Sequence, residues 1–276
     1  MNASSESAPA QRWLAHVPMV AAGTLLLAAL VLGGTLSGGT GESAVHAVAV
    51  LALGVSLLWW QPAALTVLQR GVFFVLVSAM ALATLQLAPL AVEWFVQLPQ
   101  RNEVVAELRA AGVSARRMPM TLDYWGIVQA LLAVLVFLVM WMLCTIVSSS
   151  ARTALLKLAV VAAVPMAMFG FAQASMKLDT TGANGLFENR NHYATLLAMS
   201  LPFALAAARQ AMERTAVAYA LAWYAAVCVM LLAAALSFSR VGSVLALLSA
   251  VAGLGLLTGG ASGRASLLRP ALVSLA

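Results

Sequence analysis

The sequence predicts an all-α protein, a polytopic transmembrane helix bundle of about eight helices followed by the start of a ninth. Hydrophobic residue types make up 63% of the 276 residues and charged types only 9%, whereas a soluble domain carries about 25% charged residues. Long windows of the chain contain no charged residue. So few polar side chains cannot cover a water-facing surface, which excludes a soluble globular enzyme, a disordered chain and a disulfide-rich secreted domain.

Each charge-free window is long enough to cross a bilayer, because a helix rises ~1.5 Å per residue and the hydrocarbon core is ~30 Å thick. Continuous apolar runs such as residues 131–140 lack the alternation that barrel strands require, so helices are expected. The sequence predicts a disordered N-terminal tail over 1–11 and a transmembrane helical domain over 12–276. Its spans are expected near residues 14–36, 44–61, 71–91, 125–148, 157–176, 191–208, 216–237 and 241–258.

The first and last helices of the predicted bundle are inferred from separate observations. The apolar stretch 14–36 is longer than the about 7–15 residues of a signal-peptide core, so we expect an uncleaved first helix. After the last window, the glycine-rich residues 259–263 precede the apolar segment 267–276. This pattern predicts the opening of a ninth helix, and we expect the chain to be a fragment of a longer protein.

Basic residues between the windows predict the orientation, because cytoplasmic loops of membrane proteins are enriched in Lys and Arg. With a cytoplasmic N-terminus, the short outer loops carry only Lys177, Arg190 and Arg240. The cytoplasmic loops then carry Arg12, Arg70, Arg152, Lys157, Arg209, Arg214, Arg264 and Arg269. The long loop over 93–123 lies outside in this orientation and holds four arginines and four acidic residues. We therefore expect a multi-pass protein with a cytoplasmic N-terminus.

The long outer loop contains one predicted helix. Asn102 is expected to cap it, the apolar residues between 104 and 111 share one face, and Gly112 is expected to end it. Two interpretations stay open: an amphipathic segment that lies on the bilayer surface, or a lid over a site on the outer face.

The net charge of +6 comes from single basic residues scattered between apolar runs, with no cluster that could follow a phosphate backbone. We therefore expect no nucleic acid partner, and we interpret these residues as topology signals and contacts to anionic membrane lipids or lipid-linked phosphates. Cys144 and Cys228 lie inside apolar windows and are expected to pack there, and the three histidines show no metal-ligand spacing. We predict no metal site and no cofactor.

The segment 182–194 gathers polar groups at a predicted helix start, among them Asn189, Arg190, Asn191 and His192. A helix N-terminus offers unpaired N–H groups and a partial positive charge, and a guanidinium can bind phosphate through two hydrogen bonds. The segment thus suits an anion, with His192 as a candidate acid–base. A second interpretation stays open, in which Asn189 or Asn191 caps the helix while Arg190 and His192 reach the lipid headgroups.

The segment 237–242 forms a tight link between two predicted spans. Arg240 is its one charged residue, and an arginine beside the membrane core is costly unless it is paired or functional. Ser237 and Ser239 either bind the same anion or bond back to the turn. In the predicted orientation Arg190 and Arg240 share the outer face, where they are placed to hold the two phosphates of a pyrophosphate.

At these two segments the sequence resembles the O-antigen ligase/O-antigen polymerase family of bacterial inner-membrane glycosyltransferases. Residues 185–194 resemble its G-x-F-x-N-x-N-H/Y-x-A-like stretch entering a helix, and residues 237–242 resemble its S-x-S-R followed by small residues. The segment 118–123 is similar to a P-x-S-x-D lead-in before a helix. The resemblance spans about residues 115–260, with the family-like motifs over 181–242.

The resemblance implies a transferase that takes a glycan from an undecaprenyl-diphosphate carrier at the periplasmic face of the bacterial inner membrane. The acceptor would be lipid A core, another lipid-linked glycan or a protein, and the product O-antigen or exopolysaccharide, made without nucleotide sugar or metal. The loop 93–123 would be periplasmic. The implied diphosphate site comprises Arg190, Arg240, Asn189, Asn191, Ser237 and Ser239, with His192 as the catalytic candidate. The family's large periplasmic loop follows further along its chains, so the base that activates the acceptor is expected beyond residue 276.

Two other functions fit the same composition, namely a transporter or lipid-handling membrane protein and a non-catalytic membrane scaffold. Ion-coupled transporters carry ionisable groups near the midplane of the bilayer. The predicted spans are centred on windows that contain no acidic or basic residue, which favours the transferase over an ion-coupled pump. A scaffold would be a shortened or degenerate relative of the enzyme family.

Overall fold

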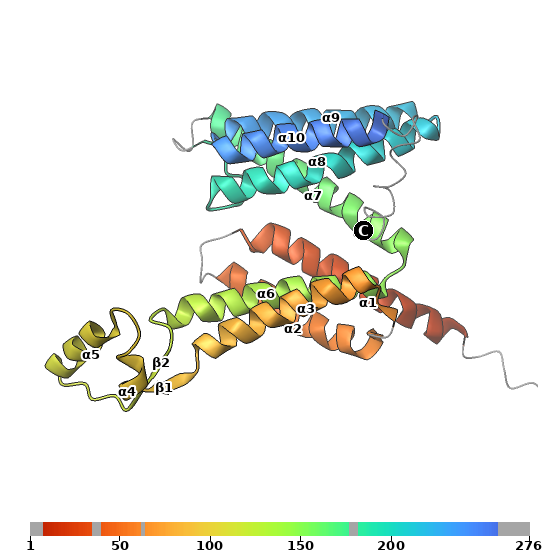
Figure 1. Ribbon diagram of the computed structural model, residues 1–276. Helices are drawn as coiled ribbons and strands as arrows, with labels where there is room; N and C mark the ends of the chain where they lie inside the picture. The colour runs from red at the N-terminus through yellow and green to blue at the C-terminus, as the bar shows by residue number, and fades with distance from the viewer. Residues whose placement is uncertain (1–7, 35–39, 62–63, 177–181, 259–276) are drawn as a thin grey trace, which may run out of the picture. The chain divides into compact units, whose positions relative to one another are not determined.

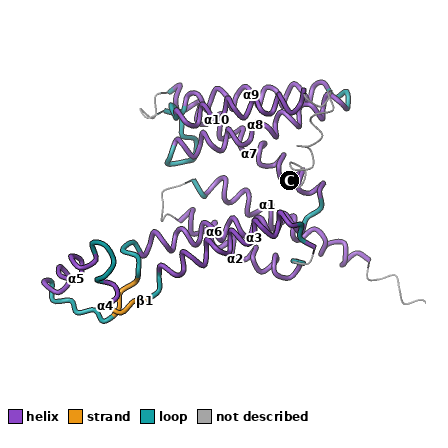
Figure 2. Tube along the Cα trace, viewed as in Figure 1, coloured by secondary structure: helices purple, strands orange, loops and turns teal. Residues whose placement is uncertain are grey.

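The computed structural model describes residues 8–34, 40–61, 64–176 and 182–258, which are helical apart from turns and one short two-stranded ribbon (Figures 1 and 2). The helices are α1 (Ala8–Leu32), α2 (Thr40–Trp59), α3 (Val67–Gln86), α4 (Val92–Phe95), α5 (Arg101–Ala110), α6 (Tyr124–Ile146), α7 (Ser149–Ser175), α8 (Arg190–Glu213), α9 (Val217–Leu236) and α10 (Arg240–Thr258). The strands are β1 (Pro89–Ala91) and β2 (Arg117–Pro119). The first seven residues of the expected tail and the expected ninth helix lie outside the described residues.

Five of the described helices are long and apolar enough to cross a membrane: α2, α3, α6, α7 and α9. Two shorter apolar stretches are His16–Leu32 in α1 and Arg240–Gly255 in α10. The prediction of an all-α fold is confirmed, and these five helices could span a membrane. Each expected span contains a helix, but α8 is not among the five, so the count of about eight spans stays a prediction.

The chain divides into two compact units, the first formed by residues 1–60 with 142–276 and the second by residues 61–141. The boundary between them falls inside α6. The first unit contains α1, α2 and α7 to α10, and the second contains α3, the ribbon, α4, α5 and most of α6.

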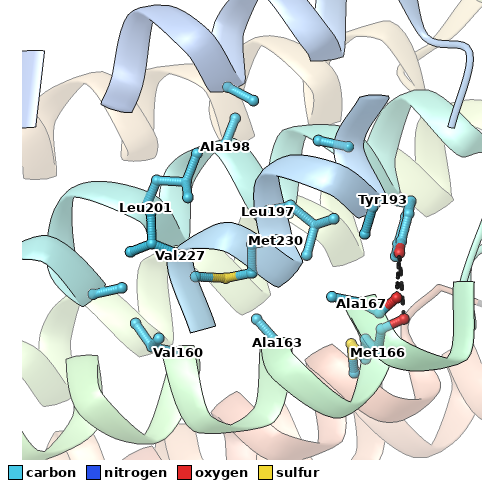
Figure 3. Close-up of a cluster of buried hydrophobic side chains, with 14 of the residues drawn as sticks. Val160, Ala163, Met166, Ala167, Tyr193, Leu197, Ala198, Leu201, Val227 and Met230 are labelled. Carbon is cyan, nitrogen blue, oxygen red and sulfur yellow. Dashed lines mark hydrogen bonds between the residues drawn. The ribbon is translucent and has the colours of Figure 1, made fainter. Parts of the chain in front are cut away.

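In the first unit α8 lies between α7, α9 and α10. Its buried face is rich in alanine, which lets the neighbouring helices approach closely. Between the alanines, Leu197 and Leu201 of α8 pack with Val160 of α7 and Met230 of α9 (Figure 3). Protein side chains therefore cover much of α8, and the polar residues that make it less apolar than the five candidate spans lie at its two ends.

Two helix boundaries of the first unit differ from the prediction. Residues 8–11, expected in the tail, form the first turn of α1, where Pro9 is tolerated because an N–H at that position has no helical partner. The helix α7 starts after Ser148, which caps it. Arg152 and Lys157, expected in a loop, therefore lie inside the helix, where arginine and lysine are good helix formers.

The long loop expected over 93–123 is a folded element of the second unit. The strands β1 and β2 pair antiparallel, with Leu90 opposite Met118, and this brings the end of α3 next to the start of α6. Val92 and Phe95 of α4 pack against Val105 of α5 in a small core. The interpretations of this segment as a surface helix or a lid stay predictions. By contrast, α3 has no buried residue.

The predicted helix in this loop is confirmed as α5, with a correction at its start. It begins at Arg101, after Gln100 in the left-handed conformation (φ 62°), so Asn102 lies inside the helix and does not cap it. Gly112 follows the helix with a φ of 79°, a conformation that glycine adopts without strain.

Candidate functional site

The helix α8 begins at Arg190, directly after the loop over residues 182–189. The Oδ1 atom of Asn189 accepts a hydrogen bond from the N–H of Asn191 at 2.8 Å, so the capping role expected for Asn189 is confirmed. The N–H of His192 donates to the carbonyl of Asn189 at 3.0 Å. Arg190, Asn191 and His192 are exposed. Because two of the first-turn N–H groups are already bonded, an anion here would be bound mainly by side chains.

The turn between α9 and α10 is held by two buried serines. Ser237 Oγ donates to the carbonyl of Ala234 at 2.6 Å and accepts from the N–H of Ser239 at 3.2 Å. Ser239 Oγ accepts from the N–H of Gly242 at 3.0 Å, which caps α10. Ser237 is 0% exposed and Ser239 is 2% exposed. Bonding back to the turn thus occupies Ser237 Oγ as donor and acceptor and Ser239 Oγ as acceptor. The turn places Arg240, which is exposed, as the first residue of α10.

The helices α8 and α10 run parallel and in close contact. A Cβ atom on Gly242 would collide with the Cβ of Ala194, and a Cβ on Gly253 would lie 2.8 Å from Cδ1 of Leu205. The two contacts are separated by the same number of residues along both helices, so both helices begin at the same end of the first unit. We call residues 189–192 together with 239–242 the paired helix starts. The structure therefore brings the two predicted motifs together.

Gln173, near the end of α7, holds the loop that leads into α8. Its Oε1 atom accepts from the N–H of Gly185 at 2.9 Å and from that of Asn184 at 3.3 Å, while its Nε2 donates to the carbonyl of Gly185 at 3.0 Å. The N–H of Ala183 donates to the carbonyl of Leu236, the last residue of α9, at 3.0 Å. Gln173 is absent from the predicted site, and its signal in the sequence is a lone amide near the end of an apolar window.

The end of α1 reaches the same loop. The N–H of Glu188 donates to the carbonyl of Gly34 at 2.8 Å, and the ring of Phe187 lies so close to Gly34 that a Cβ there would meet it at 2.8 Å. The chain segments that leave α1, α7 and α9 are thus gathered around the paired helix starts.

Tyr193 anchors the first turn of α8 in the core. Its side chain is fully buried, and its hydroxyl donates to the carbonyl of Ala167 at 3.2 Å and lies 3.4 Å from that of Met166 (Figure 3). A Cβ on either Gly170 or Gly185 would collide with Tyr193. The glycines therefore leave the room that this side chain needs, and Tyr193 fixes the backbone that carries the exposed first-turn residues.

Side chains supply the positive charge at the paired helix starts. The helices α7 and α9 end on this side while α8 and α10 begin there, so their dipoles largely oppose one another. Arg190 and Arg240 carry the guanidinium groups, and Glu188, in the loop before α8, carries a nearby carboxylate. An arrangement with two guanidinium groups and a histidine favours an anion with several oxygens.

Within the described residues, no group of three or more His, Cys, Asp and Glu side chains is placed to hold a metal ion. No family model matches the chain, and no curated protein or solved structure matches it.

Proposed function

We propose that this chain is the membrane part of a glycan transferase of the O-antigen ligase/O-antigen polymerase type in the bacterial inner membrane. Its substrate is a glycan on undecaprenyl diphosphate, and its acceptor is lipid A core, a second glycan or a protein. In this proposal the bundle has about eight spans, the N-terminus is cytoplasmic and the paired helix starts face the periplasm. The observation that carries the proposal is the parallel contact of α8 and α10, which gathers Arg190 and Arg240 at one end of the first unit.

The connections around the paired helix starts support the proposed topology. Segments that follow α1, α7 and α9 meet there, and α8 and α10 begin there. Consecutive crossings of a bilayer produce this alternation of helix ends and helix starts when the spans are α1, α2, α3 and α6 to α10. With the N-terminus in the cytoplasm, the paired helix starts would lie at the periplasmic face.

In the proposed reaction, catalysis depends mainly on electrostatic stabilisation of the departing diphosphate. The bond between the anomeric carbon and the diphosphate oxygen breaks, an acceptor hydroxyl oxygen bonds to that carbon, and the hydroxyl proton passes to a base. The departing diphosphate gains negative charge, which the guanidinium groups of Arg190 and Arg240 stabilise. His192, in the same helical turn as Arg190, is the acid–base candidate among the described residues.

The other predicted site residues have different tasks in this proposal. Asn189, Ser237 and Ser239 bond to the backbone and hold the two helix starts in place. Asn191 is exposed beside Arg190, and its side-chain amide is free to turn toward a phosphate oxygen. We therefore assign phosphate binding to Arg190, Arg240 and Asn191.

Charge removal tests the proposal. In the full-length protein, Arg190→Ala and Arg240→Ala should each abolish glycan banding while membrane insertion stays normal, because loss of one preorganised charge costs about 10²–10³ in rate. Arg209→Ala is the matched control, since Arg209 pairs with Glu213 at 2.8 Å near the other end of α8. Wild-type banding in both test variants would remove the proposal.

Labelling with an impermeant maleimide tests the topology separately. Cys144 and Cys228 are first replaced by alanine, and single cysteines are introduced at Leu186, before α8, or at Thr215, after it. On intact spheroplasts we expect labelling of Leu186→Cys and no labelling of Thr215→Cys. The reverse pattern would place the paired helix starts in the cytosol and rule out a periplasmic site.

A further inference from the structure

The second unit contains a pocket of about 460 Å³ beside the last turn of α3. This volume lies within the range of ~300–1,000 Å³ found for small-ligand sites. Its walls come from α3, from the turn between α4 and α5, and from the residues that follow β2. Leu82, Leu85, Leu98 and Met120 give it an apolar lining, and Arg101 gives it a positive charge. None of these residues belongs to the paired helix starts.

Backbone contacts hold the walls of this pocket. The N–H of Thr121 donates to the carbonyl of Gln86 at 3.0 Å, which keeps the chain leaving β2 against the end of α3. The N–H of Arg101 donates to the carbonyl of Leu98 at 3.2 Å, and between them Gln100 has a left-handed φ of 62°. This tight turn directs the first residue of α5 into the pocket wall.

The guanidinium of Arg101 is only partly satisfied by the protein. Its Cζ lies 5.4 Å from the centre of the buried Phe95 ring, a cation–π contact. Its Nη1 atom is buried and has no hydrogen-bond partner among the described residues. The Thr121 hydroxyl in the same pocket is already bonded to the backbone of Asp123, from whose N–H it accepts at 3.0 Å. Because Arg101 lines the pocket and none of the other lining residues is acidic, an anionic oxygen in the pocket would gain a charge-assisted hydrogen bond.

The position of the pocket along α3 indicates where such an oxygen comes from. The helix α3 is a candidate membrane span without buried residues, and it ends at Gln86. Leu82 and Leu85 are 62% and 59% exposed on its last turns. If α3 crosses the bilayer, these leucines lie at the border of the hydrocarbon core and Arg101 lies at the level of the headgroups.

We propose that this pocket binds one anionic phospholipid. The phosphate accepts hydrogen bonds from the Arg101 guanidinium, and one acyl chain runs along Leu82 and Leu85 of α3. A free phosphate ion would use the guanidinium alone and leave the apolar lining of the pocket exposed. The site would fasten the second unit to the headgroup layer, and it does not depend on the transferase activity proposed for the first unit.

Native mass spectrometry of the purified full chain tests the site. The protein is released from mild detergent after incubation with phosphatidylglycerol or with zwitterionic phosphatidylcholine. We expect wild type to retain phosphatidylglycerol in preference to phosphatidylcholine, and Arg101→Gln to retain about tenfold less phosphatidylglycerol. Arg109→Gln is the matched control, because Arg109 is an exposed arginine on the same helix outside the pocket lining. Equal retention by the two variants would overturn the proposal.

Two further measurements separate the pocket from surface charge. Leu85→Trp adds bulk to the pocket wall without changing the charge. It should lower phosphatidylglycerol retention as Arg101→Gln does, with an unchanged far-ultraviolet circular dichroism spectrum. Retention at the wild-type level in this variant would place the lipid elsewhere. Millimolar inorganic phosphate should leave the bound phosphatidylglycerol in place, and its displacement by phosphate would show a simple ion site and contradict the lipid assignment.

Discussion

Replacing Gly242 by alanine tests the close contact of α8 and α10. The new Cβ would collide with the Cβ of Ala194 and would lie 2.8 Å from Oγ and 3.1 Å from Cβ of Ser239. The Cβ atoms of Ala194 and Ser239 are fixed by their backbones, so the start of α10 has to move away from α8. Ser239 caps α10, which means that the displacement also strains the turn before Arg240.

The expected cost follows from two opposing terms. Overpacking of a close contact costs about 1–3 kcal/mol, whereas alanine is favoured over glycine in a helix by about 1 kcal/mol. Gly255→Ala is a matched control on the same helix, because no atom lies within 4 Å of its added Cβ. The helical preference cancels between the two variants, so Gly242→Ala should be about 1–3 kcal/mol less stable than Gly255→Ala.

Reversible unfolding in mixed micelles, followed by circular dichroism, measures this difference. A second change, Ala194→Gly, removes the opposing Cβ and should restore part of the lost stability of Gly242→Ala, since the contact with Ser239 remains. Equal stability of Gly242→Ala and Gly255→Ala would refute the close parallel packing on which the paired helix starts depend.

Two further predictions concern other parts of the molecule. Gln173→Leu removes three hydrogen bonds to the loop before α8. Proteolysis within residues 182–189 should therefore accelerate about tenfold or more, while membrane insertion stays unchanged. An unchanged cleavage rate would show that the loop is held by other contacts. Phe95→Ala should destabilise the second unit by about 3–5 kcal/mol, because Phe95 is 0% exposed. Trp94→Ala is the control, since Trp94 is 67% exposed, and it should have little effect on unfolding followed in the same micelles.

Composition and charge spacing were sufficient to predict an all-α chain with helices apolar enough to cross a membrane, because a lack of polar side chains acts on the whole chain. Helix ends were less predictable. A charge-free window of the sequence ends where the first charged residue occurs, but a helix can continue past that residue. Arg152 and Lys157 show this, because they lie in the first turns of α7. The ribbon that pairs Leu90 with Met118 joins residues far apart in the sequence, and no local pattern predicted that pairing.

In the candidate site, too, the sequence predicted the local features but not the packing of distant helices. The sequence predicted that residues near Arg190 and Arg240 form helix starts, since asparagine and serine are strong caps. It did not show that α8 and α10 are neighbours, because the contact between Gly242 and Ala194 depends on the packing of helices around α8. For the same reason it left open whether the serines of the turn face a ligand or the backbone, a question that burial decides.

The lack of buried side chains on α3 has a practical consequence for purification of this protein. Much of α8 is enclosed by its neighbours, whereas no side chain of α3 is buried. Its placement therefore depends on the surrounding apolar solvent more than on protein contacts. Harsh solubilisation would weaken the support of α3 while leaving the alanine-rich packing of α8 intact, so thick bicelles or native-lipid particles are the appropriate starting point for work on the second unit.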